Sequence, residues 1–249
     1  MRKIIILLGL VFLAGCCARQ PTDAVYQYSA ISAFMQGGYA GTLKFADIRE
    51  RGDFGLGTFD GIDGEMTALD GKFYQIRADG RVYPVEDSAL SPFAQVKFFN
   101  PDLQLAIDQE MGLAELGRFL DTALGTRNLF FALRIEGEFA YVKTRSIDRQ
   151  VKPYRPFLEV AKEQREFEFS NVRGVMVGFF SPAYLPRLTP PGYHFHFLTA
   201  DRRSGGHLLD CRIKKGTVFI DRASEFDLGL PAGQEFLGLD LNQESGAYK

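Results

Sequence analysis

Cysteine is scarce in this chain of 249 residues, which contains three: Cys16, Cys17 and Cys211. The first two stand side by side near the amino terminus, so Cys211 is the single cysteine of the expected folded region. A framework of disulfide bonds is therefore excluded. We expect Cys211 to pack as a small buried hydrophobic side chain.

An excess of charge of one sign is also missing. The formal net charge is −2, and no basic run interleaved with aromatic residues is present. Proteins that bind nucleic acid usually carry such a basic patch, so nucleic acid is not an expected partner. Tryptophan is absent, whereas the chain has 26 glycines and 23 phenylalanines, which is typical of a globular fold with many strands and tight turns.

A long apolar run occurs at the amino terminus, where two cations precede an apolar stretch of about ten residues that is too short to span a bilayer. The stretch ends in "LAGC" at 13–16, which resembles the bacterial lipobox, with Cys16 as the lipidated residue. We expect residues 1–23 to be a lipoprotein-type signal peptide and tether. The protein would be exported and anchored to a membrane of the cell envelope or periplasm by this lipid alone. An ordinary cleaved signal peptide is the alternative.

The remaining sequence predicts a mixed α+β fold. Asp-Gly turns at 70–71 and 79–80 separate short, partly alternating segments, which predict strands near 65–69, 72–77 and 81–85. The other expected elements are helices at 25–38, 43–51, 115–125 and 157–169, a hairpin over 128–147 that turns at Glu136-Gly137, and strands after 172. We expect a mixed α/β amino-terminal domain over 24–165 and a smaller antiparallel β domain over 166–249.

All three histidines of the chain, His194, His196 and His207, lie within fourteen positions. Side chains alternate along a strand, so His194 and His196 project from one face while Phe195 and Phe197 pack on the other. If the following turn is centred at 201–202, His196 pairs directly with His207, with Cβ atoms about 4.5–5.5 Å apart. Three imidazoles with an open coordination position are a common arrangement for catalytic zinc.

The same alternation assigns two nearby side chains. It places Asp210 on the face opposite His207, away from the metal, and it places Cys211 on the histidine face but two registers away. The predicted ligand set is therefore three nitrogens.

Three segments, taken together and in this order, resemble the alpha-acetolactate decarboxylase family. They are "GDFGLGTFDGIDGE" at 52–65, "VKTRSI" at 142–147 and "GYHFHFLTADRRSGGHLLD" at 192–210. The resemblance covers about 24–241. It implies a two-domain α/β fold, a homodimer with the metal between the domains, and a zinc enzyme that converts 2-acetolactate into acetoin and carbon dioxide.

The resemblance also implies roles for individual residues. Glu65 would be the acidic residue beside the metal, Arg145 the cation near the substrate, and Thr58 a pocket-lining residue. The implied zinc ligands are His194, His196 and His207. In this chemistry the departing carbon dioxide leaves an enediolate that zinc stabilises as a Lewis acid. Arg145 can hold the substrate carboxylate and Glu65 can supply the proton.

The carboxy-terminal tail departs from the family pattern. The family usually brings a second glutamate to the metal from its tail, and here Glu244 is the one carboxylate among the last nine residues, at a spacing that does not clearly match. Three alternatives follow. Glu244 is the second glutamate at the metal, that glutamate lies beyond residue 249, or the site works without a second glutamate.

Two other functions remain open. Metal-dependent enzymes of the cupin-like class also use His-x-His and a later histidine, but they usually carry a glutamate shortly after the pair, where this chain has "TAD" at 199–201. A zinc-binding surface lipoprotein would fit the anchor and the histidines, although the flexible His-rich or acidic loops typical of such proteins are absent from the sequence.

Overall fold

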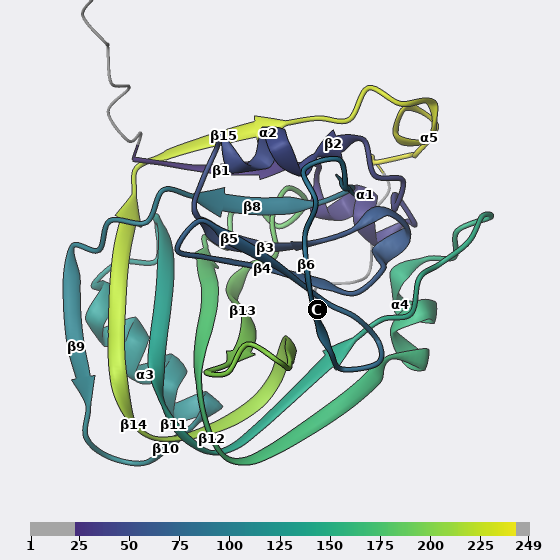
Figure 1. Cartoon of the computed structure of the whole chain (residues 1–249). Coiled ribbons are helices and arrows are strands. Elements are labelled where there is room, and N and C mark those ends of the chain that lie inside the picture. The colour runs from purple at the N-terminus through teal and green to yellow at the C-terminus, as the bar shows by residue number, and fades with distance from the viewer. Residues whose placement is uncertain (1–22, 243–249) are drawn as a thin grey trace, which may run out of the picture.

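The computed structural model describes residues 23–242, which form two large β-sheets with a few short helices (Figure 1). The mixed α+β class is therefore confirmed, with sheet predominating. In Figure 1, β1, β8 and β15 of the seven-stranded sheet run across the view, whereas β11 and β14 of the six-stranded sheet run down it. Within residues 23–242, no helix has the length and apolar character needed to cross a membrane.

The seven-stranded sheet is built mostly from the amino-terminal part of the chain and has the order β15-β1-β8-β3-β4-β5-β6. Its strands are β1 (Ala24–Tyr28), β3 (Phe54–Thr58), β4 (Glu65–Leu69), β5 (Lys72–Ile76), β6 (Val82–Pro84), β8 (Ala94–Lys97) and β15 (Glu225–Gly229). The predicted strands near 65–69, 72–77 and 81–85 are confirmed. Asp70 and Gly71 both adopt positive φ, as a two-residue hairpin turn of this kind requires.

The six-stranded sheet has the order β10-β14-β11-β12-β13, and β9 pairs with β14. Its strands are β9 (Leu103–Ile107), β10 (Met111–Gly112), β11 (Phe130–Ser146), β12 (Arg165–Ser181), β13 (Gly192–Thr199) and β14 (Gly205–Ala223). Because β13 pairs with both β12 and β14, the sheet curls back on itself. A small third sheet joins β2 (Leu43–Lys44) to β7 (Leu90–Ser91).

The prediction of a hairpin that turns at Glu136-Gly137 is wrong, because β11 (Phe130–Ser146) continues through both residues. Gly137 does not adopt the positive φ that a tight turn would need. It lies in the middle of the sheet, between Gly174 of β12 and Gly216 of β14. A Cβ atom there would collide with the main chain of β14, so this glycine permits close backbone approach instead of a turn.

The helix expected over 157–169 is also mostly wrong. α4 (Phe157–Val160) and a 3-10 turn over Ala161–Glu163 are short, and β12 begins at Arg165, where long-range pairing with β11 prevails over local helix propensity. The helix expected over 25–38 is confirmed only in α1 (Ile31–Met35), because its first residues form β1.

The remaining helices follow the sequence pattern more closely. α2 (Phe45–Arg49) and α3 (Leu113–Leu124) are confirmed, and α3 ends at Gly125 in the left-handed conformation. α5 (Gln234–Leu237) and a 3-10 turn over Asp60–Ile62 complete the list of helical elements with described residues.

Two hydrophobic cores cover the two faces of the six-stranded sheet. On one face, α3 contributes Leu116, Leu120 and Leu124, which lie four residues apart along one stripe of the helix. On the other face, side chains of both sheets pack together, such as Leu56 against Val177 and Leu198 in one cluster. The site described below lies on this second face, between the sheets.

The strand pairing does not follow a division at residue 165. β11 lies in the six-stranded sheet with β12, and β15 returns to pair with β1 in the seven-stranded sheet. The two-domain layout with that boundary stays a prediction.

Candidate functional site

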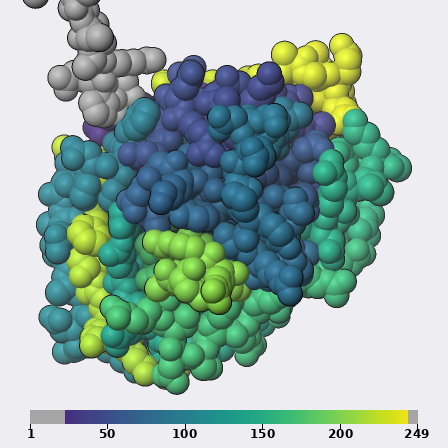
Figure 2. All heavy atoms as spheres, in the orientation of Figure 1, coloured from purple at the N-terminus to yellow at the C-terminus, as the bar shows by residue number. Residues whose placement is uncertain are grey.

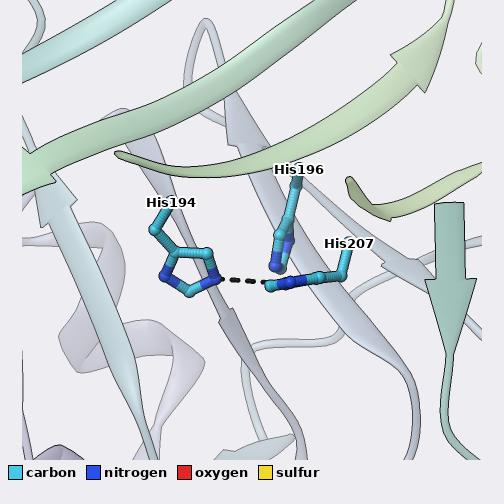
Figure 3. Close-up of side chains that lie close together, drawn as sticks. All are labelled: His194, His196 and His207. Carbon is cyan, nitrogen blue, oxygen red and sulfur yellow. Dashed lines mark hydrogen bonds between the residues drawn. The ribbon is translucent and has the colours of Figure 1, made fainter. Parts of the chain in front are cut away.

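The three histidines converge on adjacent strands, as the alternation predicts. His194 and His196 lie on β13, and His207 lies near the start of β14. The predicted direct pairing of His196 with His207 is confirmed. One ring nitrogen from each histidine lies within 4.8 Å of the others, and Figure 3 shows the three rings turned toward a common point. Phe195 and Phe197 pack into the core on the other face, as expected.

The histidine hairpin is held against the seven-stranded sheet at its turn. The Ser204 hydroxyl donates to the carbonyl of Gly80 over 2.7 Å, and the amide of Val82 donates to the carbonyl of Arg203. Figure 2 shows this turn in light green against the blue atoms of the amino-terminal part. The contact places the face that carries the histidines toward β4.

A register shift between β11 and β14 reverses the predicted sheet faces of Asp210 and Cys211. The register with β11 shifts so that His207 faces Arg145 while Asp210 faces Lys143, which puts Asp210 on the histidine side of the sheet. Asp210 is exposed and stays outside the histidine group of the described residues. Cys211 turns into the core beneath α3, so the expectation that it shares the histidine face is wrong, although its predicted burial is confirmed.

The hydrogen bonds of the imidazoles leave nitrogens available for a metal. His196 donates its Nδ1 hydrogen to the carbonyl of Met66 at 2.7 Å, which leaves the Nε2 lone pair free. His194 Nε2 lies 3.2 Å from His207 Nδ1, and His194 Nδ1 is buried without a hydrogen-bond partner among the described residues (Figure 3). The facing nitrogens, Nε2 of His194 and Nδ1 of His207, therefore offer two ligand atoms to a cation, whereas Nδ1 of His194 points away from the other two rings (Figure 3).

Burial also keeps these rings neutral. Burial, with the charge of Arg145 acting in the same direction, lowers the pKa of His194 to about 3. Burial is likewise the main reason that the pKa values of His196 and His207 fall well below the ordinary value. Neutral imidazole is the form that binds a metal, so the three histidines suit a bound cation at neutral pH.

Glu65 enters the site from the seven-stranded sheet. It is the first residue of β4, pairs with Thr58 of β3, and is 8% exposed. Its Oε2 lies 3.4 Å from Nε2 of His196. Burial raises the pKa of Glu65 to about 7, and the positive charge of Arg145 opposes this rise. Glu65 can therefore carry a proton near neutral pH.

Arg145 brings a buried positive charge to the same place. It lies on β11 opposite His207, is 8% exposed, and its Nη1 has no hydrogen-bond partner within residues 23–242. Burial lowers the pKa of Arg145 and the charge of Glu65 raises it, but a guanidinium remains charged at any physiological pH. A buried cation with a free N–H donor is suited to a carboxylate ligand.

Thr58 supports the loop that leads into Glu65. Its hydroxyl donates to the carbonyl of Gly64 over 2.6 Å, and the amide of Gly64 donates to Ile147, close to Arg145 along β11. Thr58 also lines the cavity of the site, as the sequence comparison of "GLGTFDG" implied.

All six predicted residues line one cavity of about 50 Å³ between the sheets. Its apolar lining consists of Ile31, Phe34, Gly57, Ile62, Gly64, Phe93, Ile147 and Phe157. Phe34 and Phe157 could not be predicted as site residues, because no local pattern in the sequence marks α1 and α4 as neighbours of the histidines. A larger hollow of about 640 Å³ lies elsewhere, is lined by charges such as Arg173 and Lys215, and contains no histidine. Cys16 and Glu244 lie outside the described residues.

Comparisons with known proteins show the family of this chain. A sequence model of the alpha-acetolactate decarboxylase family matches residues 25–243. The chain is 45% identical over 222 residues to an alpha-acetolactate decarboxylase of Methanosarcina mazei, covering 89% of this chain and 77% of that protein. A crystal structure of alpha-acetolactate decarboxylase from Bacillus subtilis strain 168 superposes with a TM-score of 0.87 at 40% identity, covering 89% of this chain and 94% of that one.

Proposed function

The chain belongs to the alpha-acetolactate decarboxylase family, and we propose that it uses zinc, held by the three histidines, to convert 2-acetolactate into acetoin and carbon dioxide. Its named relatives are decarboxylases, so the protein is an enzyme of the carboxy-lyase class acting on a small molecule. The observation that carries the zinc proposal is the convergence of three neutral imidazoles beside a guanidinium whose Nη1 donor has no hydrogen-bond partner among the described residues.

The residues present fit a metal cofactor. The three neutral imidazoles provide ligand nitrogens within 4.8 Å of one another, and Nε2 of His194 lies 3.2 Å from Nδ1 of His207, so the group offers the nitrogen ligands that suit zinc. The residues that would hold it are His194, His196 and His207. When bound, zinc would supply Lewis-acid chemistry for the ketone and hydroxyl oxygens of the substrate.

Arg145 would bind and orient the substrate. Its free Nη1 group can donate a hydrogen bond to the carboxylate of 2-acetolactate and form an ion pair with it. The carboxylate charge disappears as the bond to carbon dioxide breaks, and the bonding electrons move toward the neighbouring ketone. Arg145 therefore contributes mainly to binding and orientation of the carboxylate.

Glu65 would deliver the proton that the reaction consumes. The carbon atom that loses carbon dioxide takes up one proton, and a carboxyl group with a pKa near neutrality is suited to donate it. Because Glu65 comes from the opposite sheet, delivery from one side would give a single acetoin enantiomer. Solvent would then return the proton to Glu65.

The test of this proposal is an assay with the purified full-length chain. Racemic 2-acetolactate is supplied with and without a chelator, acetoin is measured, and the metal content is determined by elemental analysis. We expect acetoin formation that the chelator abolishes and that added zinc restores. Acetoin formation that persists after complete metal removal would contradict the zinc dependence.

The location and assembly are separate proposals. The motif at 13–16 supports a lipid anchor on Cys16 and a place in the cell envelope or periplasm, and the family resemblance supports a homodimer. Mass spectrometry of the amino-terminal peptide from membrane fractions tests the first, and light scattering of the purified enzyme tests the second.

A further inference from the structure

An aromatic side chain from outside the histidine hairpin forms one wall of the cavity. Phe157 is the first residue of α4, and the centre of its ring lies 5.1 Å from the guanidinium carbon of Arg145. The ring of Phe34 from α1 packs on it, with the two ring centres 5.1 Å apart. Figure 1 places α4 at the edge of the molecule, beside the end of β11 that carries Arg145.

The ring of Phe157 lies next to the charge that would bind the substrate. A guanidinium is attracted to the face of an aromatic ring, and the attraction is strongest where water is excluded. Arg145 is 8% exposed, so the contact with Phe157 replaces water beside the cation. Its Nη1 donor stays without a partner among the described residues, so the ring contact leaves this donor available.

The cavity is too small for the substrate as the structure stands. Its volume is about 50 Å³, whereas an apolar cavity that admits benzene measures about 150 Å³. 2-Acetolactate has more non-hydrogen atoms than benzene, so a wall must move when it binds.

Among the walls, α1 and α4 are helical turns outside the sheet pairing, and α4 is the less buried of the two. The histidines, Glu65 and Arg145 lie on strands that pair on both sides. α4 is a single turn, and its next residue, Leu158, is 56% exposed.

We propose that Phe157 is a positioning and size-limiting residue of this site. Its ring holds the Arg145 guanidinium toward the cavity and moves outward when the substrate carboxylate binds. The inference rests on the proposed function, since it assumes a carboxylate substrate at Arg145.

The kinetic test compares Phe157→Ala with wild type in the acetoin assay. Loss of the ring frees the guanidinium and lets water reach it, so KM is expected to rise roughly tenfold while kcat changes by less than about threefold. Phe157→Tyr keeps the ring and restores KM. Leu158→Ala, on the outer side of the same turn, is the matched control and leaves both constants unchanged. An unchanged KM in Phe157→Ala would overturn the inference.

A second readout follows the ring directly. The chain has no tryptophan, so Phe157→Trp introduces a single tryptophan at this wall, which can be excited selectively at wavelengths where the ten tyrosines do not absorb. The probe is 2-hydroxy-2-methylbutanoate, which has the carboxylate and hydroxyl groups but lacks the ketone and cannot be decarboxylated. We expect its binding to shift the Trp emission to longer wavelength in Phe157→Trp and to leave a Leu158→Trp variant unchanged. Emission of Phe157→Trp that stays constant where the probe inhibits the wild type would contradict the movement.

The two proposals fail in different ways. A wild-type enzyme that makes no acetoin overturns the proposed reaction, and the fluorescence experiment then still tests carboxylate binding beside Phe157. An active wild type with unchanged Phe157 variants overturns this inference alone.

Discussion

His196 donates a hydrogen bond from Nδ1 to the main-chain carbonyl of Met66, across 2.7 Å and 130 positions of sequence. Met66 follows Glu65 on β4, so the strand that brings the carboxyl group also sets the tautomer of a histidine on the other sheet. The bond fixes which nitrogen of His196 faces the cavity, as a partner of a metal-binding histidine commonly does. The two sheets therefore define the site jointly.

Loss of a histidine should remove the metal. We expect the zinc content of His194→Ala and of His207→Ala after dialysis to be lower than that of wild type by a factor of about ten or more, because each substitution removes one of three ligand nitrogens. Asp210→Ala is the control, since this carboxylate is exposed and outside the group. Elemental analysis checks the result, and full zinc occupancy in both histidine variants would exclude the assigned ligands.

Removal of the Glu65 carboxyl should slow turnover without removing zinc. We expect kcat of Glu65→Gln to fall by about 10²–10⁴-fold, because proton donation from a placed acid contributes on this scale. Glu138→Gln, away from the site cavity, is the control and keeps full activity. A zinc-loaded Glu65→Gln enzyme with wild-type kcat would show that the proton comes from another group.

The buried carboxyl should also make stability depend on pH in the metal-free protein. Burial raises the pKa of Glu65 from 4.5 to about 7, so the folded state holds this proton more tightly than the unfolded state. Its contribution to the free energy of unfolding is present below the lower value and is lost as pH rises through the upper one. The loss is at most about 3–4 kcal/mol, since one pKa unit corresponds to about 1.4 kcal/mol.

The histidines act in the opposite sense, because burial lowers their pKa values, so the measurable quantity is a difference between two proteins. Urea unfolding of wild type and Glu65→Gln at about pH 5 and about pH 8 isolates the Glu65 contribution. We expect the variant to gain stability relative to wild type at the higher pH. A difference that is constant with pH would mean that Glu65 is not protonated in the folded state.

Substrate binding should depend on the planar set of hydrogen-bond donors of the Arg145 guanidinium as well as on its charge. We expect Arg145→Lys to raise KM by at least about tenfold, because a lysine ammonium is a point charge that cannot reproduce the planar set of donors. The charge of Arg145 lowers the pKa of Glu65, so Arg145→Gln should move the pH profile of kcat to higher pH. Steady-state kinetics across pH measure both effects, and an unshifted profile would argue against coupling of the two residues.

Gly137 should resist substitution although it lies inside a strand. A Cβ atom at this position would meet the main chain at Lys215 and Gly216, so β14 would have to shift. We expect Gly137→Ala to lower the free energy of unfolding by about 1–3 kcal/mol. Glu138→Ala, the next residue along β11, is the matched control with little effect. Equal stability of the two variants, measured by urea unfolding, would show that the sheet accommodates the added methyl group.

Much of the histidine cluster could be predicted because its geometry is local. Strand alternation placed His194 and His196 on one face, and a short turn brought His207 opposite His196. The Asp70-Gly71 hairpin was predictable for the same reason, since its turn is encoded by two adjacent residues. The family resemblance added Glu65 and Arg145, whose approach to the histidines no spacing in the sequence could show.

The tertiary structure decided what depends on pairing between distant segments. It kept β11 continuous through Gly137, turned Cys211 into the core through a register shift, and placed Phe157 beside Arg145. These outcomes follow from the free energy of burying whole sheet faces, which prevails over local propensity. The sequence by itself therefore determined the ligand hairpin and its chemistry, whereas the packing of two sheets decided which carboxyl, which cation and which aromatic wall surround it.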